Sequence, residues 1–329
     1  MTGRYDHVLS FCLEHPWAVT PAMRLVLASI VARRLAGHKA TDEDISAALV
    51  NRRNLPQPQG DGAVAIIPVY GVIAPRVNMM TEMSGGTTFE TLTAQLGEAM
   101  GSKTVTSIVF DIDSPGGNVA GATEFAALVR EARAKKPIVA QIQYTGASAA
   151  YWIAASATKV YAAPSAMVGS IGVFTIHEDL SKALEMEGVK ITYISAGKYK
   201  VDGNETEPLG DDVKARLKAR VTEAYARFCG DISKGRGVPL GDVTGGYGEG
   251  DTVSAARALS LGMIDGISTL NDTLARVMSG TTDDRAARAS SLPAADTTQE
   301  PSPATVQDRR SDLTLQYDSF ALQAQGMTP

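Results

Sequence analysis

The sequence predicts an α/β fold in which a sheet is covered by helices. Short, fully apolar runs of strand length alternate with stretches whose apolar residues recur at helical spacing. The expected strands are residues 63–73, 107–113, 137–142, 159–163 and 190–195. The helical spacing links Phe125, Leu128, Val129 and Ala132 and, in a longer helix, Val213, Leu217, Val221, Ala224 and Phe228. Fully apolar strands are typical of a sheet that is buried on both faces.

The chain divides into four regions by composition. Residues 1–55 are expected to form a helical N-terminal region, with start signals such as Thr41 before three acidic residues. A stretch rich in Gly, Pro and Gln follows, and its end, residues 56–62, is expected to be a linker. The α/β core spans residues 63–280. Residues 281–329 contain few large apolar side chains, so we expect a disordered tail, because burial there cannot offset chain entropy.

Composition excludes several classes of function. The net charge of -5 over 329 residues does not favour nucleic acid or an anionic membrane surface as the main partner. Cys12 and Cys229 have no metal-ligand spacing and are expected to be buried as small hydrophobic side chains. The apolar run at residues 25–32 is far shorter than the roughly 20 residues that span a membrane. We therefore expect a cytoplasmic protein with no membrane span, no metal site and no cofactor.

Two loops that directly follow expected strands have the small and polar residues of a catalytic site. In residues 113–118, two consecutive glycines can expose backbone N–H groups, as an oxyanion hole requires, although Ser-Pro-Gly-Gly is also a common turn. Ser148 follows a strand and begins an alanine-rich helix, where backbone N–H groups favour developing negative charge. Ser148 can equally be a simple helix N-cap.

A third loop supplies candidate bases. Lys198 and Lys200 follow the expected strand at residues 190–195, and a lysine is a general base only when neutral. A free lysine amine has a pKa near 10.4, so this role needs burial in a desolvated cleft; otherwise both are solvated surface charges. Of the four histidines, only His177 lies within the core and could serve a Ser-His-Asp triad.

Together, four motifs in this order and spacing resemble peptidase family S49, the signal peptide peptidase A-like enzymes. The motifs are Asp113-Ser-Pro-Gly-Gly, Thr145-Gly-Ala-Ser-Ala-Ala-Tyr, Met167-Val-Gly-Ser-Ile-Gly-Val and Gly197-Lys-Tyr-Lys-Val-Asp-Gly-Asn. The resemblance covers about residues 63 to 270. Within the family, the chain is most similar to the phage prohead, or capsid maturation, proteases of the lambda C protein type.

The resemblance implies a crotonase/ClpP-like fold of stacked ββα units with a Ser-Lys catalytic pair. Carried over position by position, Ser148 matches the nucleophile and Lys200 the general base. Gly117 matches the glycine whose N–H lines the oxyanion hole, and the N–H of Ala149 adds to it. Ser170 matches a serine that orients the lysine. No cofactor or metal is implied.

The resemblance predicts a serine endopeptidase that acts in phage prohead maturation. Its expected partners are capsid, portal or scaffold proteins and further copies of itself, in the host cytoplasm or the procapsid interior. The polar tail then represents a scaffold-type extension. Three alternatives stay open: a soluble bacterial signal peptide peptidase-like protease, a crotonase-type acyl-CoA enzyme, and a catalytically idle assembly protein. The acyl-CoA alternative leaves the combination of Ser148 and Lys200 unexplained.

Overall fold

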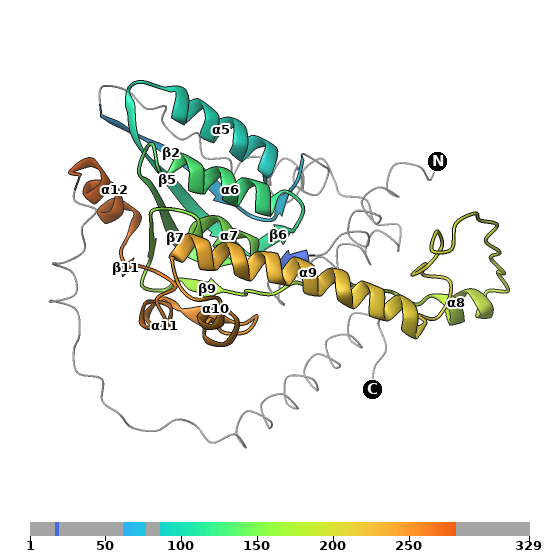
Figure 1. Ribbon diagram of the computed structural model, residues 1–329. Helices are drawn as coiled ribbons and strands as arrows, with labels where there is room; N and C mark the ends of the chain where they lie inside the picture. Colours follow the sequence, from blue (N-terminus) through green and yellow to red (C-terminus); the bar gives the residue numbers. More distant parts are fainter. Residues whose placement is uncertain (1–16, 20–61, 77–85, 281–329) are drawn as a thin grey trace, which may run out of the picture. The chain divides into compact units, whose positions relative to one another are not determined.

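A computed structural model of the chain describes residues 17–19, 62–76 and 86–280 (Figure 1). The predictions of a helical region at residues 1–55, a linker at 56–62 and a tail at 281–329 lie almost entirely outside these residues. The exceptions are Gly62, which lies in a turn, and a strand at Trp17–Val19.

The described core contains a seven-stranded and a four-stranded sheet. The larger sheet has the order β10-β9-β7-β5-β2, and β8 joins β7 to β11. Its strands are β2 (Ala63–Tyr70), β5 (Val105–Ser114), β7 (Ile138–Ala147), β8 (Lys159–Ala162), β9 (Met167–Gly169), β10 (Thr252–Ser254) and β11 (Gly266–Ile267). All pairs are parallel except β10 with β9. The smaller sheet has the order β1-β6-β3-β4, with β1 (Trp17–Val19), β6 (Gly116–Asn118), β3 (Ile73–Ala74) and β4 (Thr87–Thr88).

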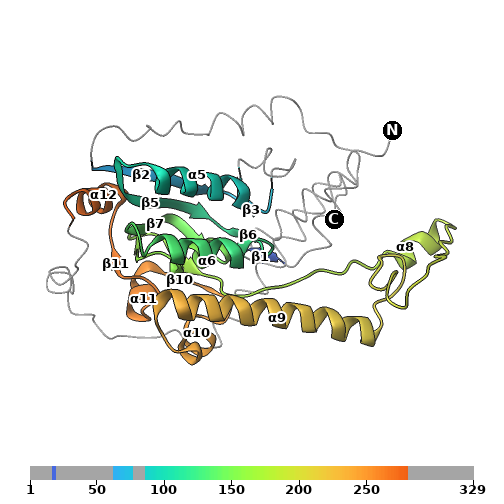
Figure 2. The ribbon, with the colours of Figure 1, turned by 45° about the horizontal axis from the view of Figure 1, so that its top comes forward.

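Helices cover both faces of the larger sheet (Figures 1 and 2). The first face carries α5 (Phe89–Gly101), α6 (Ala122–Ala132) and α7 (Ala149–Ala155), and the opposite face carries α12 (Leu270–Met278). Successive residues of β5 show the alternation: Phe110 belongs to the main core beneath α5 to α7, whereas Val109 packs with Val277 of α12. Both faces are therefore buried, as the apolar strands predict.

The longest helix among the described residues, α9 (Asp211–Arg236), packs outside α6 and α7. Its first turn carries Asp211 and Asp212 and its last turn Lys234 and Arg236, which complement the helix dipole. It ends at Gly237, whose φ of 67° closes the helix in the left-handed conformation that glycine tolerates. Beyond it lie α10 (Leu240–Gly246) and α11 (Ala255–Ser260). The predicted long amphipathic helix is thus confirmed.

Two strand predictions need correction. Residues 63–73 form two strands, because Gly71 with a φ of 62° turns the chain out of the larger sheet and into the smaller one. Residues 190–195 form no strand, although the expectation of an α/β core is confirmed. Ile191 and Ile194 are 46% and 98% exposed, so the apolar run has no neighbouring strand to pair with among the described residues.

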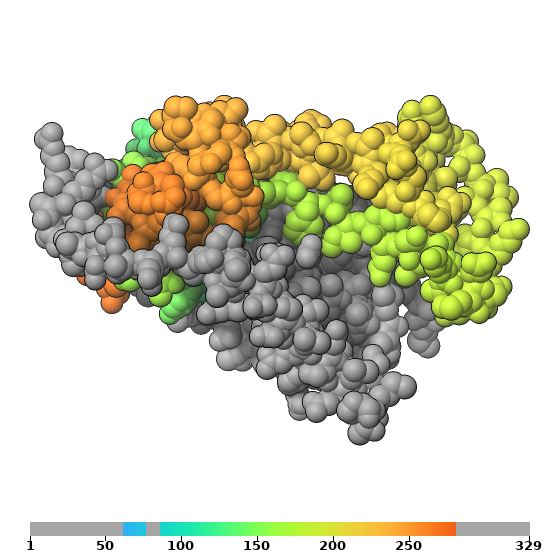
Figure 3. Space-filling model, turned by 90° about the horizontal axis from the view of Figure 1, so that it is seen from below, coloured from blue at the N-terminus to red at the C-terminus, as the bar shows by residue number. Residues whose placement is uncertain are grey.

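Residues 175–210, here called the arm, extend from the core beside the N-terminal part of α9 (Figures 1 and 3). The arm includes α8 (Ser181–Met186), which has no buried residue. It is held internally by backbone bonds such as that from the N–H of Leu180 to the oxygen of Glu205, at 2.7 Å. The arm exposes large apolar side chains: Ile176, Met186, Val189, Ile191, Tyr193, Ile194 and Tyr199. It therefore has almost no hydrophobic core of its own.

Candidate active site

Three of the four sequence motifs meet at the carboxyl ends of β5, β7 and β9. The backbone N–H of Thr145 donates to the carboxylate of Asp113 at 3.2 Å. The N–H of Ser148 donates to the carbonyl of Gly169 at 2.6 Å. Parallel strands end at the same edge of a sheet, so loops that are distant in the sequence become neighbours here.

Ser148 occupies a strained turn between β7 and α7. It has φ 57° and ψ −120°, and it is fully buried. A non-glycine residue with positive φ costs about 1–3 kcal/mol and is common at functional sites. Its Oγ has no hydrogen-bond partner within the described part of the chain, so Ser148 does not cap α7 with its side chain. The N-cap alternative therefore does not explain why a serine stands at this position.

Gly117 lies in β6, which contacts α7. A Cβ placed on Gly117 would lie 1.8 Å from the carbonyl oxygen of Ile73 in β3, so only glycine fits between these backbones. Before it, the hydroxyl of Ser114 accepts the N–H of Gly116 at 3.1 Å and donates to the carbonyl of Gly71 at 2.6 Å. These contacts hold the glycine pair in a defined strand beside the helix that begins at Ser148.

Asn118 received no role from the sequence, although it follows Gly117 directly. It is fully buried, and its Oδ1 accepts the N–H of Ala120 at 2.8 Å. Its Nδ2 has no partner among the described residues. The signal for this residue in the sequence is weak, because an Asn after Gly-Gly equally suits a turn.

The other two predicted site residues near Ser148 are Ala149 and Ser170. Ala149 is the first residue of α7, so its N–H has no acceptor within the helix. Ser170 follows β9, is almost fully buried and has a φ of 53°. Its N–H donates to the carbonyl of Asp251 at 2.7 Å, which joins the site to the segment before β10.

Packing against α9 holds the serine-bearing helix. The rings of Trp152 and Phe228 are stacked with centroids 4.2 Å apart. The indole N–H of Trp152 donates to Asp231 at 3.1 Å, and Arg130 of α6 pairs with the same carboxylate at 2.9 Å. A buried carboxylate is tolerated because both partners satisfy it. In the sequence, the signal for Asp231 is an acidic residue next to the apolar stripe of α9.

One carboxyl group near the site has a perturbed pKa. Partial burial raises the pKa of Asp113 above its ordinary value, the N–H of Thr145 opposes this, and the charge of Asp111 adds to the increase. Asp111 itself accepts hydrogen bonds from the hydroxyl of Tyr70 and, at 2.9 Å, from the amide of Gln143. The bond from Thr145 to Asp113 ties the end of β5, just before the glycine pair, to the end of β7, just before Ser148.

Lys200 lies in the arm, in an exposed turn. The neighbouring Asp202 forms an ion pair with Arg216, near the start of α9. The rise between Arg216 and Phe228, where α7 contacts the same helix, is about 18 Å at about 1.5 Å per residue. The Oγ of Ser148 has no partner within the described residues. Figure 1 shows α8 far from α7, and Figure 2 shows α8 far from β7, the strand that leads into Ser148. A single protomer thus does not bring Lys200 to Ser148.

His177 is not brought to Ser148 either. One of its ring nitrogens lies 3.0 Å from the backbone oxygen of Asn204, within the arm. No group of three or more His, Cys, Asp or Glu side chains in the described part of the chain has the arrangement of a metal site. Within the same residues, no helix combines the length and apolar character that a membrane span requires. Cys229 is buried, as predicted, and Cys12 lies outside the described residues.

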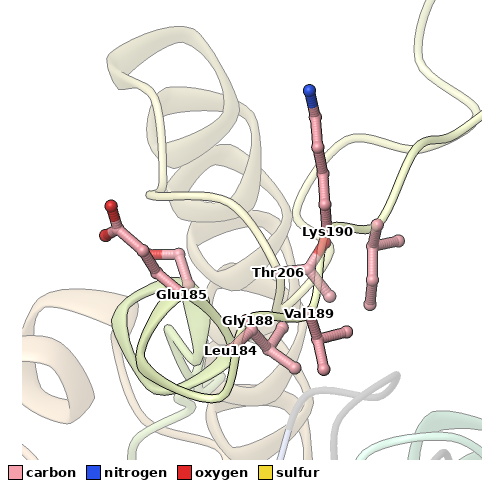
Figure 4. Close-up of a pocket in the computed structure, with 8 residues that line it drawn as sticks. Leu184, Glu185, Gly188, Val189, Lys190 and Thr206 are labelled. Atoms are coloured by element: carbon pink, nitrogen blue, oxygen red, sulfur yellow. The ribbon is translucent and has the colours of Figure 1, made fainter.

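A shallow pocket of about 340 Å³ opens in the arm between α8 and the segment that follows it (Figure 4). Leu184, Val189 and Ile191 provide its apolar wall. Glu185 and Lys190 stand on opposite sides of it, and both side chains point toward the top of the view (Figure 4). The pocket therefore belongs to the apolar surface of the arm and not to the site around Ser148.

Comparisons with known proteins identify the class. The family model described as peptidase family S49 matches residues 130–282. Capsid assembly protease C of Escherichia phage lambda is 30% identical over 299 residues, which cover 86% of this chain and 67% of that protein. Head-tail preconnector protein GP5 of Enterobacteria phage P21 is 34% identical over 182 residues, 55% of this chain and 36% of that protein.

Among solved structures, a mutant of the 1510-N membrane-bound stomatin-specific protease with a substrate peptide is 16% identical, with a TM-score of 0.41. That match covers 64% of this chain and 78% of the other. The family and its protease-named members assign the chain to the serine endopeptidases. Within that class, the chain belongs to peptidase family S49. It spans about two thirds of the lambda protein but only about a third of the P21 protein.

Proposed function

We propose that this chain cleaves peptide bonds with Ser148 as nucleophile and Lys200 as general base. The observation that supports this most strongly is the geometry of Ser148, a buried serine with an unbonded hydroxyl and a φ of 57° at a strand–helix junction. Such strain is retained where the surrounding structure holds a reactive group in position. The glycine strand β6 beside it supplies main-chain donors, so acyl transfer is the reaction class that fits.

The proposed reaction has two chemical steps. Neutral Lys200 accepts the hydroxyl proton of Ser148 while its Oγ attacks the scissile carbonyl, and the N–H groups of Gly117 and Ala149 stabilise the oxyanion. Protonated Lys200 then donates its proton to the leaving amine. A water molecule, activated by the neutral lysine, hydrolyses the acyl-enzyme. Ser170 orients the lysine amine in this scheme.

We further propose that Lys200 reaches Ser148 from a second copy of the chain. The arm carries Lys200, exposes apolar side chains over most of its length and meets α9 far from α7. An apolar surface of this kind suits a protein interface. Burial beneath a neighbouring copy removes the amine of Lys200 from water, which favours the neutral form that a general base needs.

The chain path supports the crotonase/ClpP-like fold as a proposal. Twice, a strand of the larger sheet leads into the smaller sheet and then into a helix. The first passage runs from β2 through β3 and β4 to α5, and the second runs from β5 through β6 to α6. These are ββα units that stack side by side. The next strand of the larger sheet, β7, leads directly into Ser148 and α7, at the edge where the smaller sheet lies closest.

We propose a role in phage prohead maturation, with scaffold, capsid or portal proteins as substrates. The support is that two relatives are a capsid assembly protease and a head-tail preconnector protein. The alternative is a soluble bacterial signal peptide peptidase-like protease. A bacterial relative, Protease 4 of Salmonella typhi, is 26% identical over 216 residues, 65% of this chain and 34% of that protein. The gene neighbourhood separates the two. Adjacent genes for portal and major capsid proteins, whose products are specifically cleaved when they are coexpressed with this chain, support the phage role. Neighbours unrelated to capsids, or capsid proteins that stay intact, favour the alternative.

The catalytic pair is tested by mixing variants. Ser148→Ala and Lys200→Ala chains are purified separately, and each is expected to lose casein hydrolysis, with only Ser148→Ala losing its site for a fluorophosphonate probe. If the base comes from a second copy, mixed oligomers that are dissociated and reassembled regain activity, because some interfaces pair an intact Ser148 with an intact Lys200. Recovery requires the exchange step, so the same mixture without dissociation is the control.

Three outcomes separate the parts of this proposal. Continued hydrolysis by a folded Ser148→Ala chain refutes the nucleophile. Full activity of Lys200→Ala refutes the base and directs attention to His177. Loss of activity in both variants without recovery after mixing keeps the pair but places both residues in one subunit.

A further inference from the structure

The candidate site is closed to substrate. Ser148, Ala149 and Asn118 are fully buried, and Ser170 is 3% exposed. Gly117 is buried as well. A protease must place an extended peptide with its carbonyl carbon against the nucleophile. Some part of the chain must therefore be displaced before a peptide can reach Ser148.

The strand β1 lies at the edge of β6, the strand that carries Gly117. It pairs antiparallel with β6, so that Trp17 lies opposite Asn118, Ala18 opposite Gly117 and Val19 opposite Gly116. On its other side, β6 pairs with β3, where Ile73 lies opposite Gly117. The edge of β6 that does not face β3 is thus occupied by a segment far away in the sequence.

An extended peptide commonly binds by adding a strand to a free sheet edge. If Gly117 contributes to the oxyanion hole, a substrate strand has to run along β6 so that its carbonyl lies near both Gly117 and Ser148. The edge opposite β3 is the one available for that strand. Trp17–Val19 now holds it.

We propose that residues 17–19 occupy the position of the substrate strand, so that the chain covers its own peptide-binding edge. This inference rests on the proposed role of Ser148 and Gly117. A small residue, Ala18, is the one paired with Gly117 in this register. The occupant is released, or exchanged for a substrate strand, before catalysis.

The strand is suited to release. It has only three residues, and strands of that length depend on their neighbours for stability. In the sequence, Pro16 precedes it and Pro21 follows it two residues later, and proline lacks the N–H that a ladder requires. The pairing therefore has little scope to lengthen, and a longer substrate strand can compete with it.

A reversible crosslink tests the position. In a full-length Cys12→Ser background, Trp17→Cys and Asn118→Cys place two cysteines directly opposite one another. Opposed residues of antiparallel strands have Cα atoms about 4.5–5.5 Å apart, which is within the range of a disulfide. The oxidised protein is expected to lose casein hydrolysis and fluorophosphonate labelling of Ser148 by about 10-fold or more. Reduction is expected to restore both in the same sample, and the Asn118→Cys single variant is the control for that substitution.

A second variant opens the edge instead. Ala18→Pro removes an N–H and adds a ring within β1, while Ala18→Gly keeps the N–H. Losing about one ladder hydrogen bond changes an equilibrium up to about tenfold, so Ala18→Pro is expected to be labelled several-fold to tenfold faster than Ala18→Gly. A synthetic peptide with the sequence of residues 14–22 is expected to inhibit the wild-type enzyme competitively.

The outcomes distinguish this inference from the proposed function. Equal labelling of the oxidised and reduced crosslinked protein, or no disulfide at all, overturns the placement of β1 while leaving Ser148 as nucleophile. The placement of β1 is likewise overturned if Ala18→Pro is folded but its Ser148 is labelled no faster than that of Ala18→Gly. Absence of Ser148 labelling in every variant, open or closed, overturns the proposed function and this inference with it.

Discussion

The Gly235→Ala substitution tests whether close packing of α9 against the end of α7 holds the serine-bearing helix. A Cβ on Gly235 would lie 2.2 Å from the carbonyl oxygen of Ala155 and 3.3 Å from the Cα of Ser156. These are backbone atoms, which cannot rotate away. The guanidinium of Arg133 also donates to the carbonyl of Gly235 at 2.9 Å and to that of Ser156 at 3.1 Å. The two segments must therefore separate, and these bonds must lengthen.

The loss of stability in Gly235→Ala can be measured against an alanine substitution at Gly230, a glycine in the same helix. Close carbon–oxygen contacts are about 3.3–3.6 Å, so Gly235→Ala needs a displacement of about 1 Å, and overpacking of this kind costs about 1–3 kcal/mol. A Cβ on Gly230 would meet no neighbouring heavy atom within 4 Å, so Gly230→Ala keeps only the helix-propensity gain of about 0.5–1 kcal/mol. The propensity gain is similar in both variants. The free energies of unfolding should then differ by about 1–3 kcal/mol, with Gly230→Ala the more stable.

Both variants are measured in a Ser148→Ala background, which prevents self-cleavage during the experiment. Guanidinium unfolding followed by far-UV circular dichroism gives the free energies, and melting temperatures should differ by roughly 2–4 °C for each kcal/mol in a domain of this size. Gly235→Ala that is as stable as Gly230→Ala would refute the argument, because the clash would then be relieved without cost.

Three further predictions concern the site, the acid limit of stability and the buried thiol. Gly117→Ala should lower kcat about 100-fold or more, because its Cβ would lie 1.8 Å from the carbonyl oxygen of Ile73. The control is Gly97→Ala, whose Cβ would have no neighbour within 4 Å and which should keep full casein hydrolysis. Equal rates of casein hydrolysis by the two variants would contradict this prediction. Burial opposes the charge of Asp265, but hydrogen bonding to Arg236 prevails and holds its pKa below the ordinary value. The ionised carboxylate thus stabilises the fold above about pH 4, and this stabilisation is lost as the pH falls further. Urea unfolding should therefore show Asp265→Asn less stable than the wild type at pH 7, with a smaller difference in the free energy of unfolding at pH 3. A difference that stays constant with pH would be contrary evidence. Burial raises the pKa of the Cys229 thiol, so in a Cys12→Ser chain Ellman's reagent should react only after denaturant is added, and rapid native reaction would contradict the burial.

Sequence periodicity was reliable where a segment packs within its own protomer. Strands such as 107–113 and 137–142 and the helix containing Phe228 were confirmed, because their apolar residues face a core made by the same chain. The pattern at residues 190–195 was misleading because this segment does not pack against a core made by the same chain. Its apolar residues are exposed in the protomer, and alternation alone cannot reveal whether a pairing partner exists.

The sequence by itself determined the α/β class, most element positions and the four motifs that mark the S49 family, since these depend on local spacing and residue type. Only the tertiary structure decided which motifs meet. It joins the loops of Gly117, Ser148 and Ser170 at one sheet edge and leaves Lys200 on the arm. It also reveals β1 on the edge of β6, a pairing between segments about a hundred residues apart. Such contacts depend on chain topology and on surfaces that a second copy can cover, and neither leaves a local pattern in the sequence.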